Sequence, residues 1–565
     1  MRKKISILLI VLITCISCRT LAQQPSWQLY IDLKKHAGPL APIWASFGYD
    51  EPNVTTTADG TKLLGELSAL SPAPVYIRTH NLLNSGDGTY SLKWGSTNAY
   101  SEDASGAPIY NWKIMDSIFD AIVSRGMKPI AEIGFMPEAL SAHPVPYRHH
   151  WQPGMPYDKI YTGWAYPPTD YAKWAGLVYR WVTHAVKRYG KTEVESWYWE
   201  VWNEPNIGYW QGSPAQYREL YDYTADAVKR ACPGARVGGP ASTGPGWDKA
   251  ALFLKAFLAH CDSGRNAVTG RKGAPLDFIS FHAKGSPRIV KGQVRMNLAT
   301  ELRDVQSGFR IIAASRFKKL PVLVTEFDPE GCAACGMTTN PENAYRNGTM
   351  YSSYTAATFC RLYDLALRYG VSLKRATSWS FEFEGQRWFD GFRSLATHGI
   401  DKPVLNVFRM YGMMAGDRLG VVNARALPMD SLLASSVHGT TPDVHALATE
   451  GKNQTSVMIW NYSDEQAPRQ PAMVHLSIKN IPAAKVLLLH FRIDQDHSNA
   501  YTAWKRMGSP QQVTPRQYRV LERTGQLQLL RSPRWIKTKD GTAEFSFSLP
   551  GEGISLLRLE YQNND

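Results

Sequence analysis

Eight short β-rich runs alternate with helix-like segments along most of the chain, and this alternation constrains the fold more than any other feature. Each run is followed by a stretch long enough for a crossover helix, such as residues 170–190 and 214–234. Strands that alternate with helices form a parallel sheet, and eight such repeats predict a closed (β/α)8 TIM barrel over residues 42–415. The competing fold is a doubly wound open sheet, but nothing after the first run resembles a Gly-rich nucleotide loop. The predicted strands are 42–48, 75–80, 128–134, 196–204, 235–242, 276–283, 320–327 and 375–383.

The pattern changes after about residue 416, where alternating strands follow one another without long helices between them. Examples are "AMVHLSIKNIP", "AKVLLLHFRID" and "AEFSFSLPGEGISLLRLEYQ", with turn residues between them. Such a run predicts a C-terminal antiparallel β-sandwich domain over residues 416–565. The stretch "SWQLYIDLKK" precedes the first barrel strand, so we predict that residues 23–41 add a strand to this sandwich. The expected fold is therefore α/β, a barrel followed by a β-sandwich.

The first 22 residues are predicted to be a secretory signal peptide. Three basic residues at positions 2–4 precede an apolar run over 5–15 that is too short for a membrane span. Small residues before a cut after Ala22 fit the cleavage site, whereas lipoprotein-type cleavage before Cys18 is the weaker alternative. No later segment has the apolar length of a transmembrane helix, so we expect a secreted or periplasmic protein without a membrane span.

The charge and the cysteines narrow the classes of partner. The formal net charge is +14, but the basic residues are spread along the chain, which argues against a nucleic-acid-binding arm. Affinity for an acidic polysaccharide or a negatively charged surface stays open.

The cysteines that follow the signal peptide are odd in number, so at least one thiol is free or pairs between chains. For the closely spaced Cys332 and Cys335 we favour a local disulfide that clips a loop over a thiol-redox role.

One glutamate within "WYWEVWNEPNIGYW" (197–210) stands out because aromatic residues surround it. Glu204 ends the fourth predicted strand and precedes a proline. Apolar surroundings disfavour the charged form of a carboxyl group and raise its pKa, which suits a proton donor that works near neutral pH. A buried strand end with a satisfied Glu is the alternative for this residue alone. Glu200 shares the same strand face and is expected to lie inside the strand or behind the site.

A second carboxylate, Glu326 in "VLVTEFDPEG", ends the seventh predicted strand. Active sites of (β/α)8 barrels lie at the C-terminal ends of the strands, and the ends of strands four and seven can face each other across the mouth. Glycoside cleavage needs two such carboxylates, one to protonate the leaving oxygen and one to attack the anomeric carbon or activate water. Glu204 is the predicted acid and Glu326 the predicted nucleophile. A retaining mechanism then requires carboxyl groups about 5–5.5 Å apart.

Several motifs resemble glycoside hydrolase family 39, namely "WNEPN", "TEF", "IRTHN", "AEIGFMPEAL" and "GIDKPVLNVF". The family comprises β-xylosidases and α-L-iduronidases with retaining barrels, and the similarity runs from about residue 27 to the end. The tripeptide "NEP" is shared by many families, whereas "EIGFMP" and "KPVLNVF" narrow the match. The resemblance implies that Glu204 is the acid/base and Glu326 the nucleophile. It also implies that Asn203 binds the sugar 2-hydroxyl and that His80 lines the sugar subsite.

Four further residues bear on the identity of the sugar through this resemblance. His282 and Lys284 in "FISFHAKG" resemble the iduronidase segment in which a Lys contacts the uronate carboxylate. Arg393 stands where iduronidases have an Arg, so Lys284 and Arg393 are predicted to clamp a carboxylate. The alternative has Lys284 solvated and Arg393 paired with an acidic residue nearby in the sequence. Glu384 resembles the acidic residue with which xylosidases contact sugar hydroxyls, and this favours the opposite substrate.

The sequence therefore predicts a retaining, exo-acting glycoside hydrolase that releases a terminal sugar from oligosaccharides of plant or host polysaccharides. A uronic acid is one expected sugar and β-xylose is the alternative. A non-catalytic carbohydrate-binding protein and an endo-acting xylanase-like enzyme are the rival interpretations. No HExxH, Walker loop or second CxxC is present, so we expect no cofactor and no metal. The expected partner is an oligosaccharide or polysaccharide, not a nucleic acid.

Overall fold

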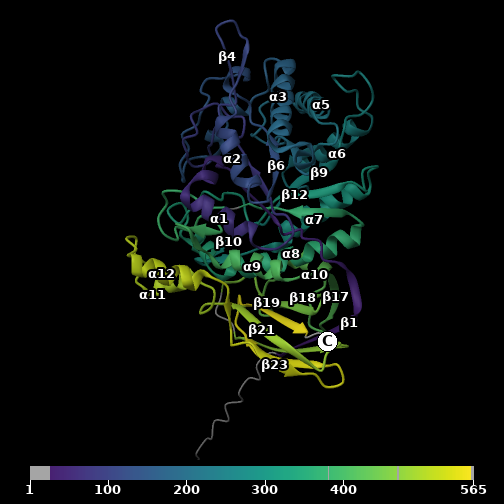
Figure 1. The fold of residues 1–565 in the computed structure, drawn as a ribbon, viewed down its shortest axis with the longest axis vertical. Helices are drawn as coiled ribbons and strands as arrows, with labels where there is room; N and C mark the ends of the chain where they lie inside the picture. Colours follow the sequence, from purple (N-terminus) through teal and green to yellow (C-terminus); the bar gives the residue numbers. More distant parts are fainter. Residues whose placement is uncertain (1–25, 380, 467–469, 562–565) are drawn as a thin grey trace, which may run out of the picture.

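The computed structural model describes residues 26–379, 381–466 and 470–561 (Figure 1). The predicted signal peptide and its cleavage site lie outside these residues. A barrel with its surrounding helices forms the upper part of the molecule in Figure 1, and a strand-rich domain forms the lower part. Within the described ranges, every helix is too short or too polar to cross a membrane.

Parallel strands close into a ring, which confirms the (β/α)8 barrel. The eighth strand is split, because β13 pairs with β12 while β14 pairs with β2 and so completes the circle. Side chains of the strands are buried almost without interruption, as expected for a parallel sheet covered by helices. The barrel strands are β2 (Ser46–Tyr49), β3 (Tyr76–Thr79), β6 (Lys128–Ile133), β7 (Tyr198–Val201), β8 (Arg236–Ser242), β9 (Phe278–Lys284), β12 (Pro321–Asp328), β13 (Ser372–Ala376) and β14 (Ser378–Trp379).

The helices around the barrel begin and end where local chemistry satisfies their free backbone groups. At the start of α5, the Ser213 side chain accepts from the Gln216 backbone N–H, and Gln216 bonds back in a capping box. At the end of α8, Gly370 adopts φ 63°, a left-handed conformation that suits glycine. The helices are α1 (Ala58–Ser68), α2 (Lys113–Val123), α3 (Tyr171–Tyr189), α4 (Lys191–Glu195), α5 (Pro214–Ala231), α6 (Asp248–Ser263), α7 (Leu298–Ala313), α8 (Thr349–Tyr369), α9 (Pro403–Met413) and α10 (Met429–Ser435).

The second domain is one strongly curled sheet whose inner-face side chains form a core of their own. β1, from the N-terminal side of the barrel, pairs antiparallel with β17 and parallel with β20. The strands that follow the barrel pair antiparallel, as predicted, and the sheet is mixed because β1, which comes from a distant part of the chain, pairs parallel with β20. Its strands are β1 (Ser26–Pro39), β17 (Asp417–Val422), β18 (Asp443–Gly451), β19 (Gln454–Tyr462), β20 (Ala472–Lys479), β21 (Lys485–Ile493), β22 (Gln528–Leu529), β23 (Arg534–Lys537), β24 (Ala543–Leu549) and β25 (Ile554–Tyr561).

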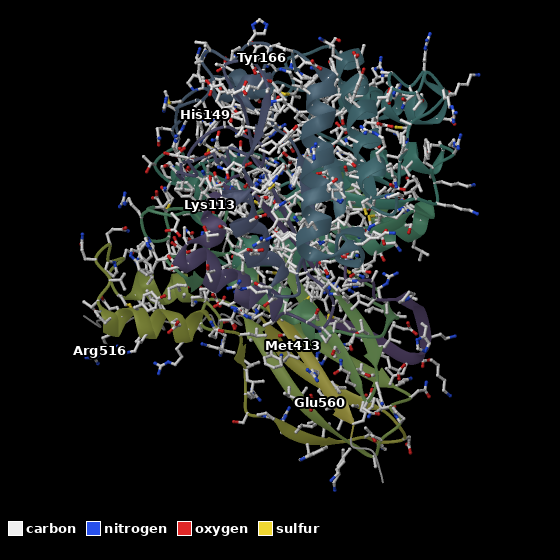
Figure 2. The ribbon with its side chains drawn as sticks, turned by 45° about the horizontal axis from the view of Figure 1, so that its top comes forward. Lys113, His149, Tyr166, Met413, Arg516 and Glu560 are labelled. Atoms are coloured by element: carbon white, nitrogen blue, oxygen red, sulfur yellow. A yellow bond between two sulfur atoms is a disulfide. The ribbon has the colours of Figure 1, made fainter. Side chains whose placement is uncertain are left out.

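An excursion between β21 and β22 joins the two domains. It holds α11 (Ala500–Arg506) and α12 (Pro515–Gly525), which project to one side in Figure 1. The Asn406 amide on α9 donates to the Gly525 carbonyl at 2.6 Å, so the barrel holds this excursion directly. Figure 2 shows Arg516 at the outer side of α12 and Met413 at the junction of the domains. Short hairpins complete the fold: β4 (Tyr100–Glu102), β5 (Pro108–Tyr110), β10 (Arg288–Val290), β11 (Gln293–Arg295), β15 (Ala396–Thr397) and β16 (Ile400–Asp401).

Candidate active site

A cavity of about 250 Å³ lies at the C-terminal ends of the barrel strands. Both predicted catalytic glutamates line it, as do His80 and Lys284 from the predicted sugar-binding set. All lining residues belong to strand ends or to the loops that follow them, where active sites of this fold are found. They are Asp50, His80, Lys93, Tyr157, Glu204, Tyr209, Lys284, Glu326, Gly331, Cys332 and Trp379.

Glu204 and Glu326 face each other across this cavity. One oxygen of each carboxylate and Nδ1 of His282 all lie within 4.8 Å of one another. This approach suits a retaining glycosidase, whose carboxyl groups lie about 5–5.5 Å apart, and not an inverting one, which needs about 6.5–9.5 Å for a water molecule. His282 Nδ1 lies 2.9 Å from Glu204 Oε1 and holds that carboxylate in place.

The backbone that presents Glu204 is strained. β7 ends at Val201, so Glu204 stands in the turn after the strand and not on the strand itself. Trp202 and Glu204 have φ angles of 70° and 44°, which residues other than glycine rarely adopt. Each such residue costs on the order of 1–3 kcal/mol and persists only where its surroundings fix it. Here the Glu204 N–H donates to the Ala241 carbonyl of β8 at 2.9 Å.

Cations surround Glu326, the predicted nucleophile. Lys284 Nζ lies 2.6 Å from one oxygen, and Arg78 Nη1 lies 3.2 Å from the other. Burial pushes the pKa of Glu326 upward, but His282, Lys284 and His80 outweigh it and hold the pKa well below its ordinary value. Glu326 is therefore a carboxylate anion at neutral pH, the protonation state that a nucleophile needs.

The same cations bear on metal binding. One group of metal-ligating side chains is found among the described residues, made up of Glu204, His282 and Glu326. A metal ion would have to displace Lys284 from Glu326, and the ammonium group already supplies the positive charge there. We assign no metal to this site.

Arg78, which was not predicted as a site residue, links the nucleophile to the barrel interior. Its guanidinium is fully buried and contacts three carboxylates, with Nε 2.5 Å from Glu200 and Nη2 2.9 Å from Glu132 in addition to Glu326. Arg78 Nη2 also donates to Asn203 Oδ1 at 3.1 Å, which orients the predicted 2-hydroxyl ligand. The signal was present in "IRTHN", because a charged residue in the middle of a buried strand requires partners.

His80 lies beside Glu326 and binds two further carboxylates. Its Nδ1 is 2.8 Å from Asp50, and its Nε2 is 3.2 Å from Glu132. Burial lowers the pKa of His80, but Glu132, Asp50 and Glu326 raise it to about 9. The imidazole is thus positively charged at neutral pH.

The raised pKa of His80 predicts a pH dependence of stability. A folded-state pKa of about 9 against about 6.5 in the unfolded chain gives a contribution that is complete below pH 6.5 and is lost as pH rises through 9. The shift corresponds to roughly 3 kcal/mol at about 1.4 kcal/mol per pKa unit. We expect the stability difference between the wild type and His80→Asn, from urea unfolding, to shrink between pH 6.5 and 10. A difference that stays constant over that range would contradict the assignment.

Two of the residues predicted to bind the sugar, Arg393 and Glu384, do not line the cavity. Arg393 is fully buried, with Nη1 2.9 Å from Glu330 and Nη2 3.3 Å from Asp328. Its remaining N–H groups bond to backbone carbonyls, so it has no donor left for a substrate. Lys284 and Arg393 do converge, but on the protein carboxylate of Asp328, and Lys284 also pairs with Glu326.

The partners of Arg393 could not be predicted because they are distant in sequence. Glu330, 63 residues away, binds it, and not the nearby acidic residues that the alternative considered. Glu384 is also outside the cavity lining, because it accepts a hydrogen bond from Thr57, the N-cap of α1. Asn203 and His282 are not lining residues but contact groups of the site, Asn203 through Arg78 and His282 through the lining residue Glu204.

Asp50, Lys93, Tyr157 and Tyr209 also line the cavity, although the sequence did not predict them as site residues. Lys93 Nζ pairs with Asp50 and lies 5.4 Å over the Tyr157 ring, and the Tyr157 hydroxyl is 2.8 Å from that of Tyr209. Asp50 follows β2 directly, so the rule that found the glutamates could have found it. Lys93 lies in the long loop after β3, where no periodicity marks it.

A disulfide closes one wall of the cavity. Cys332 and Cys335 are bonded, with Cα atoms 5.5 Å apart, which confirms the predicted local disulfide. Cys332 lines the cavity next to Gly331. In the described part of the chain, the other cysteines are free and buried: Cys232, Cys261 and Cys360.

Comparison with known proteins gives consistent matches along the chain. The model of the Glycosyl hydrolases family 39 matches residues 27–532. A β-xylosidase of Caldicellulosiruptor saccharolyticus is 28% identical over 425 residues, covering 73% of this chain and 76% of that protein. An α-L-iduronidase of Mus musculus is 24% identical over 526 residues, covering 88% and 75%.

Solved structures show the same fold. The GH39 enzyme from Xanthomonas axonopodis pv. citri superimposes with a TM-score of 0.74 at 22% identity, covering 96% of this chain and 99% of that one. A monomeric β-xylosidase from Caulobacter crescentus gives 0.71 at 22% identity, covering 94% and 99%.

Proposed function

We propose a substrate and residue roles on the premise that the chain belongs to family 39 of the glycosyl hydrolases. As a member of this family it is a glycosidase that hydrolyses O-glycosyl bonds with retention of configuration. The proposed reaction is the exo-acting release of one terminal neutral sugar, with a β-xyloside as the first candidate. The donors are oligosaccharides derived from polysaccharides.

The observation that carries this proposal is a pair of opposed carboxylates inside one small cavity. At about 250 Å³ the cavity is smaller than the about 300–1,000 Å³ that drug-sized ligands occupy, so it suits one sugar ring better than a chain. An exo-acting enzyme needs only the terminal ring to enter. An endo-acting enzyme would need an open cleft on both sides of the carboxylates.

The geometry supports a double displacement. The ionised Glu326 attacks the anomeric carbon, while Glu204 gives its proton to the leaving oxygen and the glycosidic C–O bond breaks. In the second step Glu204 takes a proton from water, the water oxygen attacks the anomeric carbon, and the ester to Glu326 breaks. His282 orients Glu204 through its contact of 2.9 Å. Asn203, held by Arg78, is the proposed ligand of the sugar 2-hydroxyl.

The state of Arg393 favours a neutral sugar. Its donors are all engaged by protein groups, so a uronate carboxylate would find no guanidinium in the cavity. A uronide is the second candidate, and one observation favours it. Two ammonium groups, those of Lys93 and Lys284, line the same cavity and could bind a carboxylate.

We also propose that the protein is exported. The N-terminal signal pattern supports this, and so does the disulfide between Cys332 and Cys335, because disulfides persist in oxidising compartments. Export would bring the enzyme to polysaccharides outside the cytoplasm.

A panel of aryl glycosides tests the substrate. We expect the highest kcat/KM for the β-xyloside among β-xyloside, α-L-iduronide, β-glucuronide, α-L-arabinoside and β-galactoside. Lys93→Met is run in parallel, because losing one of two charge-assisted bonds to a carboxylate should cost a uronide roughly 1.5–3 kcal/mol, or about 10- to 100-fold. If a uronide is the best substrate and Lys93→Met selectively removes that preference, the second candidate replaces the first.

Two other outcomes would overturn the proposal altogether. Absence of aryl release from every glycoside would favour a non-catalytic carbohydrate-binding protein. Shorter oligomers from a polymer without free monosaccharide would favour an endo-acting enzyme.

A further inference from the structure

A second cavity, of about 540 Å³, lies behind the loop that carries Glu204. The loop follows β7 and has two faces. Glu204 and Tyr209 line the catalytic cavity, whereas residues 205–208 and Trp210 line the second one. The helices α5 and α6 supply the other walls. Tyr217 and Arg218 lie on α5, and the lining residues on α6 are Lys249, Leu252, Phe253, Ala256 and Phe257.

The loop between the two cavities is firmly held. The Asn206 amide donates to Thr243 Oγ1 at 2.6 Å, and its carbonyl accepts from the Thr243 N–H at 3.0 Å. The Ile207 N–H donates to the Glu204 carbonyl at 3.1 Å. The loop is thus held in one conformation, and both the nitrogen and the oxygen of the Asn206 side-chain amide are hydrogen-bonded to Thr243.

The walls of the second cavity are aromatic and aliphatic. Trp210, Tyr217 and Phe257 are buried at its base, and Leu252 on its rim is 65% exposed. The polar atoms of the large rings are already used, since Tyr217 Oη donates to the Val201 carbonyl and Trp210 Nε1 to the Ser213 carbonyl, both at 3.0 Å. A sugar would therefore find few hydrogen-bond partners here.

Two cations are the free polar groups of the lining. Among the residues that the structure describes, no carboxylate lies within ion-pair distance of Arg218 or Lys249. Lys249 Nζ instead lies 5.5 Å over the ring of Trp247, a side chain that is 50% exposed. Unpaired cations beside aromatic walls complement a ligand with an anionic end and a flat apolar body.

We propose that this cavity binds an aromatic monocarboxylate, with the ring between the aromatic walls and the carboxylate on Arg218 and Lys249. Its volume lies within the about 300–1,000 Å³ of small-molecule sites. The proposed ligand must contact both the apolar lining and the two cations. Neutral sugars lack the negative charge and small inorganic anions lack the apolar body, so neither is expected to bind. The site is separate from the catalytic cavity, because the loop of residues 204–210 stands between them.

Calorimetric titration of the full-length protein with trans-cinnamate, and with the neutral cinnamamide of the same shape, tests the site. We expect cinnamate to bind at least 10-fold more tightly than the amide. The double variant Arg218→Gln/Lys249→Gln should remove this preference while leaving the amide unaffected. Ala256→Trp, at an exposed lining position, should fill the cavity and abolish binding of both. Leu367→Trp is the matched control and should bind as the wild type does, because this position is 69% exposed and lies on α8, which contributes no residue to the lining.

Three results would overturn the proposal. The first is equal affinity of the wild type for cinnamate and cinnamamide. The second is undiminished cinnamate binding by Ala256→Trp with an unchanged melting temperature. The third is competition between cinnamate and an aryl glycoside that persists in Ala256→Trp. The last would place the acid in the catalytic cavity. None of these results depends on which sugar the enzyme prefers. The proposed binding site can therefore be refuted while the proposed function stands, and the proposed function can be refuted while the binding site stands.

Discussion

Glu326→Gln should lower the hydrolysis of every aryl glycoside by on the order of 10⁴-fold or more, the scale on which loss of a catalytic nucleophile acts. The physical reason is that the neutral amide cannot form the glycosyl ester. The amide keeps the size of the side chain, so the fold should persist. The measurement is kcat/KM on the best glycoside of the panel, with circular dichroism to verify folding.

Glu204→Gln is the matched variant, and its loss should depend on the leaving group. General acid catalysis contributes about 10²–10⁴-fold, and a dinitrophenyl leaving group departs without a proton. We therefore expect the two variants to separate widely on dinitrophenyl glycosides and to converge on alkyl glycosides. Azide should restore turnover in Glu204→Gln by attacking the intermediate, giving a glycosyl azide of retained configuration. Equal losses in both variants on the activated substrate would reverse or remove the assigned roles.

The barrel and its two glutamates could be predicted from sequence because they follow from local rules. Alternation of strands and helices indicates a parallel sheet, and the position of a carboxylate at a strand end indicates which edge it occupies. The predicted ends of the elements differ from those in the structure. The fourth predicted strand ran to Glu204, whereas β7 ends at Val201 and a turn with positive φ presents the carboxylate.

The surroundings of the glutamates could not be predicted because they depend on contacts between distant segments. Arg78 meets Glu326 across 248 residues of sequence, and Lys284 meets it across 42. Arg393 was placed in the substrate site by resemblance, yet the loop after β12 folds back so that Glu330 neutralises it. A sequence pattern indicates that a buried arginine needs a carboxylate, but not which one.

Arg78→Met should be the most destabilising single substitution in the site. It leaves Glu132, Glu200 and Glu326 without their shared cation in the barrel interior, where Arg78 itself is fully buried. Removing one member of a buried ion pair costs about 3–5 kcal/mol, because the partner keeps its desolvation penalty. Urea unfolding at pH 8 should show a loss of this size, together with loss of activity.

The destabilisation by Arg78→Met should also depend on pH in a defined direction. In the wild type, burial outweighs His80 and Arg78 and raises the pKa of Glu132 to about 7, so the folded state already binds a proton that the unfolded chain releases. Without Arg78 the pKa rises further. Both proteins lose stability alike between about pH 5 and 7, but above about pH 7 the wild type levels off while the variant continues to lose stability, so its deficit should be smaller at pH 5 than at pH 8.

Two further variants separate this electrostatic cost from the loss of a large side chain. Arg188→Met breaks ion pairs of a side chain that is 39% exposed, and such surface pairs contribute about 0–1 kcal/mol. Arg78→Met/Glu200→Gln removes one of the uncompensated carboxylates and should recover part of the loss at pH 8. If the deficit of Arg78→Met were the same at both pH values and the double variant recovered nothing, packing and not charge would account for it. The buried carboxylates of Glu132 and Glu200 would then not carry the negative charge that this prediction assigns to them.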